Sequence, residues 1–275
     1  MQVLPFLKMH GLGNDYVYLD CFSSTTAAIL AQTDIAALAR RISDRHFGIG
    51  SDGLVLILPI TNADAYMRMF NADGSEAQMC GNAIRCVAKY LYESGICHHD
   101  DLQIATRAGM RSLHVHVTNG VVEQVTVDMG KPVVVEDTIR LDNKVLQFVA
   151  VNMGNPHAVF FRDTMISTEE LFLLGERIGT HSHFPEGANV EFVKVVNNKE
   201  ICMRVWERGT GETFACGTGA CAAAAAAILQ GYTDRDITIH LKGGDLHIRW
   251  ESDDSPMFMT GSATEVFRGE YDLYD

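Results

Sequence analysis

Short apolar or alternating runs make up most of the chain, and turn residues bound each of them. Runs of this kind, rich in Val, Ile, Phe and Tyr, predict β-strands rather than helices. Turn signals such as Asn119-Gly120 and Gly243-Gly244 separate neighbouring runs. The predicted strands are Val3–Met9, Tyr16–Asp20, Gly53–Ile60, Ala65–Phe70, Leu113–Val117, Val121–Met129, Val145–Val151, His157–Phe161, Val190–Val196, Ile201–Glu207, Ile237–Leu241, Leu246–Glu251 and Met257–Ser262.

Helical periodicity is confined to a few segments, which are Asp34–Ser43, Gly81–Ser94, Thr168–Gly179 and Gly217–Gln230. The first can be capped by Thr33 or Asp34, and a polar start precedes the third. The alanine run 222–227 predicts a helix packed closely on all sides. Mostly β structure with one long apolar helix in each half predicts an α+β fold, in which curved sheets surround a central helix.

The two halves of the sequence resemble each other. One half reads Asn71-Ala-Asp-Gly-Ser-Glu-Ala-Gln-Met-Cys80-Gly-Asn-Ala and the other Glu207-Arg-Gly-Thr-Gly-Glu-Thr-Phe-Ala-Cys216-Gly-Thr-Gly. Aligning Cys80 with Cys216 places Glu76 on Glu212. A second similarity lies upstream, between Met9-His-Gly-Leu-Gly-Asn14 and Met153-Gly-Asn-Pro-His157. Duplicated halves normally face each other across a pseudo-two-fold axis, so we expect the two cysteines on opposite walls of one cleft.

Each of these cysteines precedes a Gly-x-x segment that begins a predicted helix. The first backbone N–H groups of a helix have no intrahelical partner, and that end of the helix dipole is positive. A thiol there should ionise more readily than a free thiol, whose pKa is about 8.5. The same amides can hold a substrate carboxylate.

A pair of thiols placed in this way suits the inversion of an amino-acid α-carbon. The reaction removes a proton from one face and delivers one to the other, and each thiol can act as acid or base according to direction. Pyridoxal phosphate enzymes use a Schiff-base lysine instead. Lys8, Lys89 and Lys131 are isolated in the sequence, so we expect no cofactor.

Other interpretations of the cysteines stay open. A structural zinc site favours C-x2–4-C pairs with a clustered His, which the cysteine spacings here do not provide, so we predict no metal site. A covalent thiol hydrolase is a minor alternative, with His157 as its base. The cysteines best explained as buried apolar residues are Cys21, Cys86, Cys97, Cys202 and Cys221. Most histidines, including the His98-His99 pair, are interpreted as solvated.

Bulk properties narrow the class of protein. A length of 275 residues favours two domains. A formal net charge of -13 argues against nucleic acid and anionic membranes as partners. Unpaired cysteines in a chain of this size, without a signal-peptide pattern at the N-terminus, predict a cytoplasmic protein.

Seven short motifs in order resemble those of diaminopimelate epimerases over essentially the whole chain. They are Met9-His-Gly-Leu-Gly-Asn-Asp15, Arg45-His-Phe-Gly-Ile-Gly50, Phe70-Asn-Ala-Asp-Gly-Ser75, Met79-Cys-Gly-Asn-Ala-Ile-Arg-Cys86, Met153-Gly-Asn-Pro-His157, Glu207-Arg208 and Ala215-Cys-Gly-Thr-Gly-Ala-Cys221. The resemblance implies two pseudo-symmetric domains, with the C-terminal strand returning to the first, and a homodimer. We expect an N-terminal domain of residues 1–124 plus 263–275 carrying Cys80, and a C-terminal domain of residues 125–262 carrying Cys216.

The resemblance also assigns roles to residues. Cys80 and Cys216 would be the acid/base thiols, and the amides of Gly81, Asn82, Gly217 and Thr218 would hold the reacting carboxylate. His157 and Glu207 would support proton handling. The residues that would bind the rest of the substrate are Asn14, Asn71, Asn155, Asn189, Glu207 and Arg208. Turn formation is the alternative role for Asn155 and Asn189.

The expected function is the interconversion of LL- and meso-diaminopimelate, for lysine or cell-wall precursor synthesis. Two residues depart from patterns seen in the family: some members carry Gln where this chain has Gly53, and Gly is more usual where it has Ala83. The alternatives are an epimerase or racemase of histidine, lanthionine or a proline-type amino acid, and a non-catalytic small-molecule binding protein of the same fold.

Overall fold

The computed structural model describes residues 3–273. They form two compact units: unit 1 extends up to Val127 and resumes at Gly261, and unit 2 is the continuous segment Asp128–Thr260. Among the described residues, no helix combines the length and apolar character needed to cross a bilayer.

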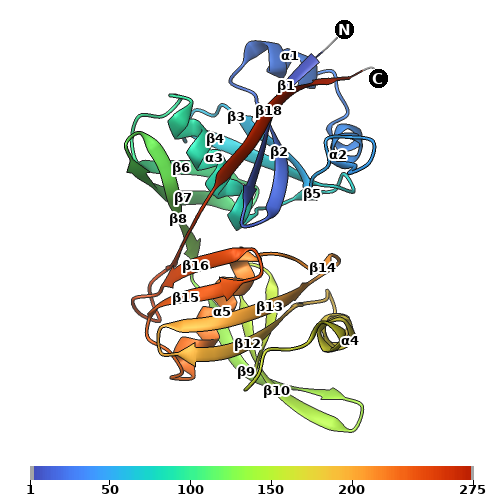
Figure 1. Cartoon of the computed structure of the whole chain (residues 1–275), viewed down its shortest axis with the longest axis vertical. Coiled ribbons are helices and arrows are strands. Elements are labelled where there is room, and N and C mark those ends of the chain that lie inside the picture. Colours follow the sequence, from blue (N-terminus) through green and yellow to red (C-terminus); the bar gives the residue numbers. More distant parts are fainter. Residues whose placement is uncertain (1–2, 274–275) are drawn as a thin grey trace. The chain divides into compact units, whose positions relative to one another are not determined.

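Unit 1 is a curved sheet with one buried helix. Its elements are β1 (Val3–Gly11), β2 (Asn14–Asp20), α1 (Ser24–Leu30), α2 (Ile35–Ser43), β3 (Gly53–Leu58), β4 (Ala65–Asn71), β5 (Glu76–Ala77), α3 (Gly81–Glu93), β6 (Asp101–Thr106), β7 (Gly109–Thr118), β8 (Val121–Gly130), which runs into unit 2, and β18 (Thr264–Asp272). The C-terminal strand β18, dark red in Figure 1, pairs antiparallel with β1. Unit 1 is therefore complete only when both ends of the chain meet.

Unit 2 repeats this arrangement. Its elements are β9 (Val133–Leu141), β10 (Lys144–Asn152), β11 (Pro156–Phe161), α4 (Thr168–Gly179), β12 (Asn189–Asn197), β13 (Glu200–Glu207), β14 (Gly211–Glu212), α5 (Gly217–Leu229), β15 (Asp236–Leu241), β16 (Gly244–Arg249) and β17 (Met257–Gly261). The parallel pairs β2–β3 and β4–β6 of unit 1 correspond to β11–β12 and β13–β15 of unit 2. The antiparallel pairs β3–β4 and β4–β5 correspond likewise to β12–β13 and β13–β14. The similarity seen in the sequence is thus a repeated topology.

The central helices α3 and α5 each contain 13 residues and pack against the strands of their own unit. Ala222–Ala227 are all 0% exposed, as close packing predicts. Side chains this small allow a helix to approach the surrounding sheet on every side. Separate clusters of apolar side chains lie under α2 in unit 1 and under α4 in unit 2.

The predicted helices and strands are all present, with ends that differ by a few residues. The α+β fold of two similar units is confirmed. The prediction missed the short helix α1 and the strands β5, β6, β9, β14 and β18, although the resemblance implied the last of these.

Candidate active site

Both cysteines occupy the N-cap position of a central helix. The backbone angles are φ -136° and ψ 122° at Cys80, and φ -118° and ψ 111° at Cys216. Each cysteine is thus extended, with the first free amides of its helix directly after it. None of the seven cysteines, all within residues 3–273, forms a disulfide.

The Cys80 thiol belongs to a chain of oriented hydrogen bonds within unit 1. Asn14 Nδ2 donates to Asp52 Oδ2 over 2.8 Å. This carboxylate also accepts from the backbone N–H of Asp15 over 3.0 Å. Because a carboxylate can only accept, the amide carbonyl of Asn14 must point the other way. Asn14 Oδ1 accordingly lies 3.3 Å from Cys80 Sγ and 3.3 Å from Asn82 Nδ2.

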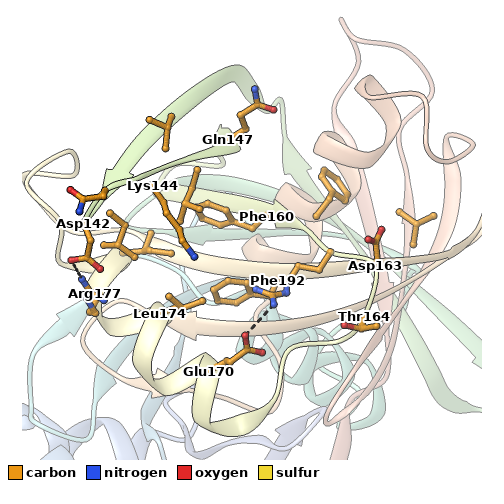
Figure 2. A pocket seen from close by; sticks show the side chains of 18 of the residues that line it. Asp142, Lys144, Gln147, Phe160, Asp163, Thr164, Glu170, Leu174, Arg177 and Phe192 are labelled. Carbon is orange, nitrogen blue, oxygen red and sulfur yellow. Dashed lines mark hydrogen bonds and ion pairs between the residues drawn. The ribbon is translucent and has the colours of Figure 1, made fainter.

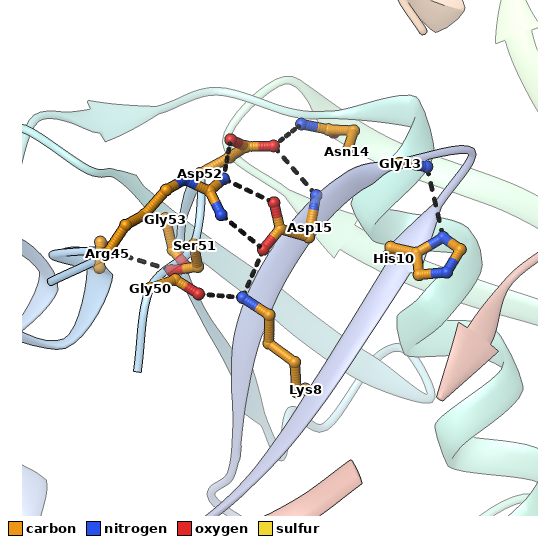
Figure 3. A network of polar contacts seen from close by, with 11 residues as sticks. Lys8, His10, Gly13, Asn14, Asp15, Arg45, Gly50, Ser51, Asp52 and Gly53 are labelled. Atoms are coloured by element: carbon orange, nitrogen blue, oxygen red, sulfur yellow. Dashed lines mark hydrogen bonds and ion pairs between the residues drawn. The ribbon is translucent and has the colours of Figure 1, made fainter. Parts of the chain in front are cut away.

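Charged residues hold Asp52 in turn, as Figure 3 shows. Arg45 Nη2 lies 2.9 Å from Asp52 Oδ1 and 2.8 Å from Asp15 Oδ1. Lys8 pairs with Asp15 and donates to the carbonyl of Gly50. Burial alone would raise the pKa of Asp15, but hydrogen bonds and charges from Arg45 and Lys8 lower it. The network thus favours the ionised form of Asp15 and holds Asn14 in one orientation.

The Cys216 thiol caps its own helix in unit 2. Its sulfur accepts from the backbone N–H of Gly219 over 3.4 Å and lies 3.6 Å from Thr218 Oγ1. Burial, followed by the charges of Glu207 and Glu191, raises the pKa of Cys216 well above its usual value. The expectation of easier ionisation at a helix N-terminus is therefore wrong for the resting state of this thiol, because burial and two acidic neighbours outweigh the amides.

Glu207 lies at the end of β13, close to this thiol. Burial raises its pKa, Thr213 and Cys216 hydrogen-bond to it, and the charge of Glu191 raises the pKa further. A carboxylate of raised pKa beside a thiol is suited to accept the thiol proton.

His157 lies at the start of β11, in a buried polar cluster. Its Nδ1 lies 2.6 Å from Glu191 Oε1 and its Nε2 lies 3.0 Å from Asn155 Oδ1, so both ring nitrogens face oxygen. Both side chains of the His157–Glu191 pair are 0% exposed. Burial raises the pKa of Glu191, while His157 opposes that shift. The cluster directs Asn155 Nδ2 toward Thr218 Oγ1, 3.4 Å away, and so reaches the start of α5.

An ionic contact between an arginine and a glutamate occurs before each of the two cysteines. In unit 1, Arg68 Nε on β4 binds Glu76 Oε1 on β5 over 2.6 Å. In unit 2, Arg204 Nε on β13 binds Glu212 Oε1 on β14 over 2.9 Å. Each glutamate precedes its cysteine by four positions. The two contacts, called here the Arg–Glu clamps, fasten the loop that delivers each thiol.

The remaining predicted residues have varied environments. Asn189 is buried at the start of β12; it accepts from the backbone N–H of Arg208 over 2.9 Å and donates to the carbonyl of Pro156 over 3.3 Å. Arg208 is exposed and donates to the carbonyl of Glu186. Asn71 is exposed and donates to Ser75 Oγ over 3.0 Å.

Gly53 is one of the two departures from the family pattern, and the surrounding backbone requires glycine there. A Cβ at this position would lie 2.1 Å from the carbonyl oxygen of Phe70, so no side chain fits on this backbone. Ala83, the other departure, is fully buried, and its carbonyl accepts from the Tyr18 hydroxyl over 3.4 Å.

Sequence reasoning missed several residues of the two half-sites, namely Asp52, Arg68, Glu191, Arg204 and Thr213. Glu191 carried a signal, since it is the one charged residue in the apolar run Val190–Val193. A charge in such a run needs a buried partner.

A cavity of about 1350 Å³ in unit 2, shown in Figure 2, lies elsewhere. Its walls include residues of β10, β11 and α4, and the ion pairs Asp142–Arg177 and Arg162–Glu170 are formed between residues that line it. None of the predicted site residues lines it. Its volume alone does not identify a substrate site.

Comparisons with known proteins agree on one family. The family model described as diaminopimelate epimerase matches residues 6–135 and 149–266. A diaminopimelate epimerase of Acetivibrio thermocellus is 45% identical over 98% of this chain and 99% of its own length. One from Desulfovibrio desulfuricans is 47% identical over 98% of each chain.

Solved structures share the fold at low identity. A phenazine biosynthesis protein of the PhzF family from Bacillus anthracis has a TM-score of 0.75 at 16% identity, covering 99% of this chain and 100% of its own. A hydroxyproline epimerase from Agrobacterium vitis has a TM-score of 0.73 at 17% identity, covering 100% of this chain and 93% of its own. At such identities the likeness concerns the fold alone.

Proposed function

Because the chain belongs to the diaminopimelate epimerase family, we propose that it is an isomerase that interconverts LL- and meso-diaminopimelate. The single observation that carries the mechanism is the pair of cysteines at the N-caps of topologically equivalent helices. Proton exchange at an α-carbon needs an acid/base group on each face and donors for the carboxylate, and each half-site supplies one of each.

In this mechanism Cys80 and Cys216 lie on opposite sides of the substrate α-carbon. One sulfur, as thiolate, takes the α-proton, and the other, as thiol, delivers its proton to the opposite face. The amides of Gly81 and Asn82, and those of Gly217 and Thr218, stabilise the carboxylate beside the developing carbanion. The electron pair returns to the α-carbon, so no cofactor is required.

One of the two thiols must lose its proton before the reaction can begin, and a nearby carboxylate can accept that proton. Cys216 is a thiol at rest because its pKa is raised, and Glu207 beside it is a carboxylate of raised pKa. We assign the transfer from Cys216 Sγ to Glu207, after which the Gly219 N–H stabilises the thiolate. His157 acts indirectly, since it holds Asn155 near Thr218.

The other end of the substrate carries a second ammonium and carboxylate. Arg208 suits the carboxylate, and Asn71 and Asn155 suit the ammonium. Asn189 would position Arg208 through its backbone N–H, and Asn14 would line the wall beside Cys80. An exposed Arg208 is free to reorient when substrate arrives.

Assembly, location and domain limits are part of the proposal. A homodimer would cover exposed apolar side chains of β18 such as Val266 and Phe267. A reducing compartment, the cytoplasm, suits seven cysteines that form no disulfide. The domains would be residues 1–124 plus 263–275 and residues 125–262. Light scattering after gel filtration and limited proteolysis test the first and last of these points.

The test of the function is incubation of the reduced protein with LL-diaminopimelate in D2O. We expect deuterium at the inverted α-carbon and meso product, measured by NMR and chiral separation. Cys80→Ala and Cys216→Ala should each abolish formation of the meso product, and Cys202→Ala, which removes a thiol from β13, serves as the matched control.

Other outcomes separate the alternatives. Exchange with histidine, lanthionine or proline, but none with diaminopimelate, would retain the two-thiol mechanism and change the substrate. Binding of an amino acid without any exchange would leave a binding protein of this fold. Loss of exchange in Cys202→Ala as well would show that thiol removal acts through the fold.

A further inference from the structure

Unit 1 contains a cluster of Asp, Cys and His side chains that the proposed reaction does not use. Asp64 directly precedes β4, and Cys97 and His99 lie in the loop before β6. The strands β4 and β6 run parallel and pair at Ala65 and Ile104, so the segments that enter them lie at one edge of the sheet. One ligand atom from each of the three residues lies within 4.8 Å of the other two.

The contacts of His99 orient its ring so that one nitrogen faces Asp64. His99 Nδ1 lies 2.8 Å from the carbonyl oxygen of Asp101, which only accepts, so Nδ1 carries a proton. The other ring nitrogen, Nε2, faces Asp64 Oδ1, which lies 3.1 Å away. The two atoms are therefore about as far apart as two ligands of one metal ion.

The surroundings of the cluster resemble those of metal ligands. The carbonyl that binds Nδ1 fixes the histidine tautomer and leaves Nε2 available, as outer-shell groups do in metal sites. Asp64 Oδ2 accepts from the backbone N–H of Gln103 over 2.7 Å, which orients the carboxylate so that Oδ1 faces His99. Cys97 is only 6% exposed, so the protein largely shields this cysteine from solvent.

We propose that Asp64, Cys97 and His99 bind one Zn²⁺ ion, with water in the fourth position. One sulfur, one imidazole nitrogen and one carboxylate oxygen suit zinc, whereas Mg²⁺ and Ca²⁺ favour oxygen alone. Tetrahedral zinc separates its ligand atoms by about 3.3–3.8 Å. The Asp64–His99 separation of 3.1 Å is close to this, and the other two do not exceed 4.8 Å.

The proposal concerns stability rather than turnover. Asp64 is at the entrance of β4, and Asn71 is at its other end, about 20 Å away for a strand of seven residues. A bound ion would tie the entrances of β4 and β6 together. The proposal is independent of the epimerase reaction.

The test titrates metal-stripped, reduced protein with Zn²⁺ against a chromogenic chelator. Since the thiols of Cys80 and Cys216 can also bind zinc, the comparison is made in the Cys80→Ala/Cys216→Ala background. We expect one tight equivalent, and affinity in Cys97→Ser and His99→Ala should fall by more than the roughly 10–100-fold that loss of an outer-shell partner costs. Co²⁺ in place of zinc should give a thiolate charge-transfer band that Cys97→Ser lacks.

Two matched controls are available. His240→Ala removes a surface histidine that pairs with Asp245 at 2.8 Å, and Cys202→Ser removes a thiol from β13. Both variants should still bind one zinc ion tightly. Zinc should raise the melting temperature of the parent protein but not that of Cys97→Ser. The proposal would be overturned if the parent protein and Cys97→Ser bound zinc with equal affinity, or if the parent bound no zinc ion tightly. If Cys97→Ser or His99→Ala fails to fold, Asp64→Asn is compared with the parent in its place.

Discussion

At the scale of single residues, the orientation of one amide links a charged network to a thiol. Asp52 accepts from Asn14 Nδ2, so Asn14 Oδ1 is presented to Cys80. A carbonyl oxygen can bind the thiol S–H but not the thiolate. Asp52 therefore acts on Cys80 through Asn14, and we regard it as a positioning residue.

Asp52→Asn tests this role. An amide at position 52 can donate as well as accept, so Asn14 is free to turn its NH2 group toward Cys80. We expect kcat for α-proton exchange to fall roughly 100-fold, as misplacement of a reacting group does, while KM changes little. Asp254→Asn, which alters an exposed carboxylate, is the control. An unchanged kcat, or a fall matched by a lower melting temperature, would contradict a positioning role.

At the scale of elements, the Arg–Glu clamps have the same geometry but different burial. In unit 2 the side chains of Arg204 and Glu212 are 18% and 9% exposed, whereas those of Arg68 and Glu76 are 37% and 22% exposed. Water screens the clamp of unit 1 more strongly. The loop before Cys216 should therefore depend more on its clamp than the loop before Cys80.

Glu212→Gln and Glu76→Gln form a matched pair of variants. Leaving Arg204 without its carboxylate should lower the free energy of unfolding by about 2–3 kcal/mol, because a charge stays partly buried. Glu76→Gln should cost about 1 kcal/mol or less. Urea unfolding measures both, and an equal loss in the two variants would show that burial does not set the strength of the clamps.

The comparison of sequence with structure also belongs at this scale. The helices and the long strands were predictable because 3.6-residue or alternating patterns extend over many positions. The two-residue strands β5 and β14 carry no pattern, and the acidic pair Glu136-Asp137 interrupts β9. The thiols were predictable from duplication. The acidic residues behind each thiol, Asp52 and Glu191, were not, because a single charged residue does not reveal which distant side chain it faces.

At the scale of the whole molecule, buried thiols limit stability in alkali. Burial raises the pKa of Cys86 to about 11 and that of Cys21 to about 12. A raised folded-state pKa contributes stability that is complete below the unfolded value, near 9, and is lost as pH rises through the folded value. The free energy of unfolding should therefore fall from about pH 9 upward.

Cys86→Ser isolates one such contribution, because serine does not titrate in this range. Two pKa units correspond to about 2–3 kcal/mol, so the variant should lose about that much less stability than the parent between pH 8 and pH 11. Urea unfolding under reductant at both pH values measures this difference. Cys202→Ser, which alters a half-buried thiol, should match the parent. Parallel curves for Cys86→Ser and the parent would exclude Cys86 as a source of the loss.

The pairing of β1 with β18 also has a consequence for the order in which the protein is made. Unit 2 is continuous and can fold as soon as residue 260 has left the ribosome. Most of unit 1 is synthesised before unit 2, yet its strand β1 lacks one partner until β18 has been synthesised. During that time β1 presents one unpaired edge, on which neighbouring nascent chains can assemble. Messages truncated before codon 264 should thus yield a folded second half attached to an aggregation-prone first half.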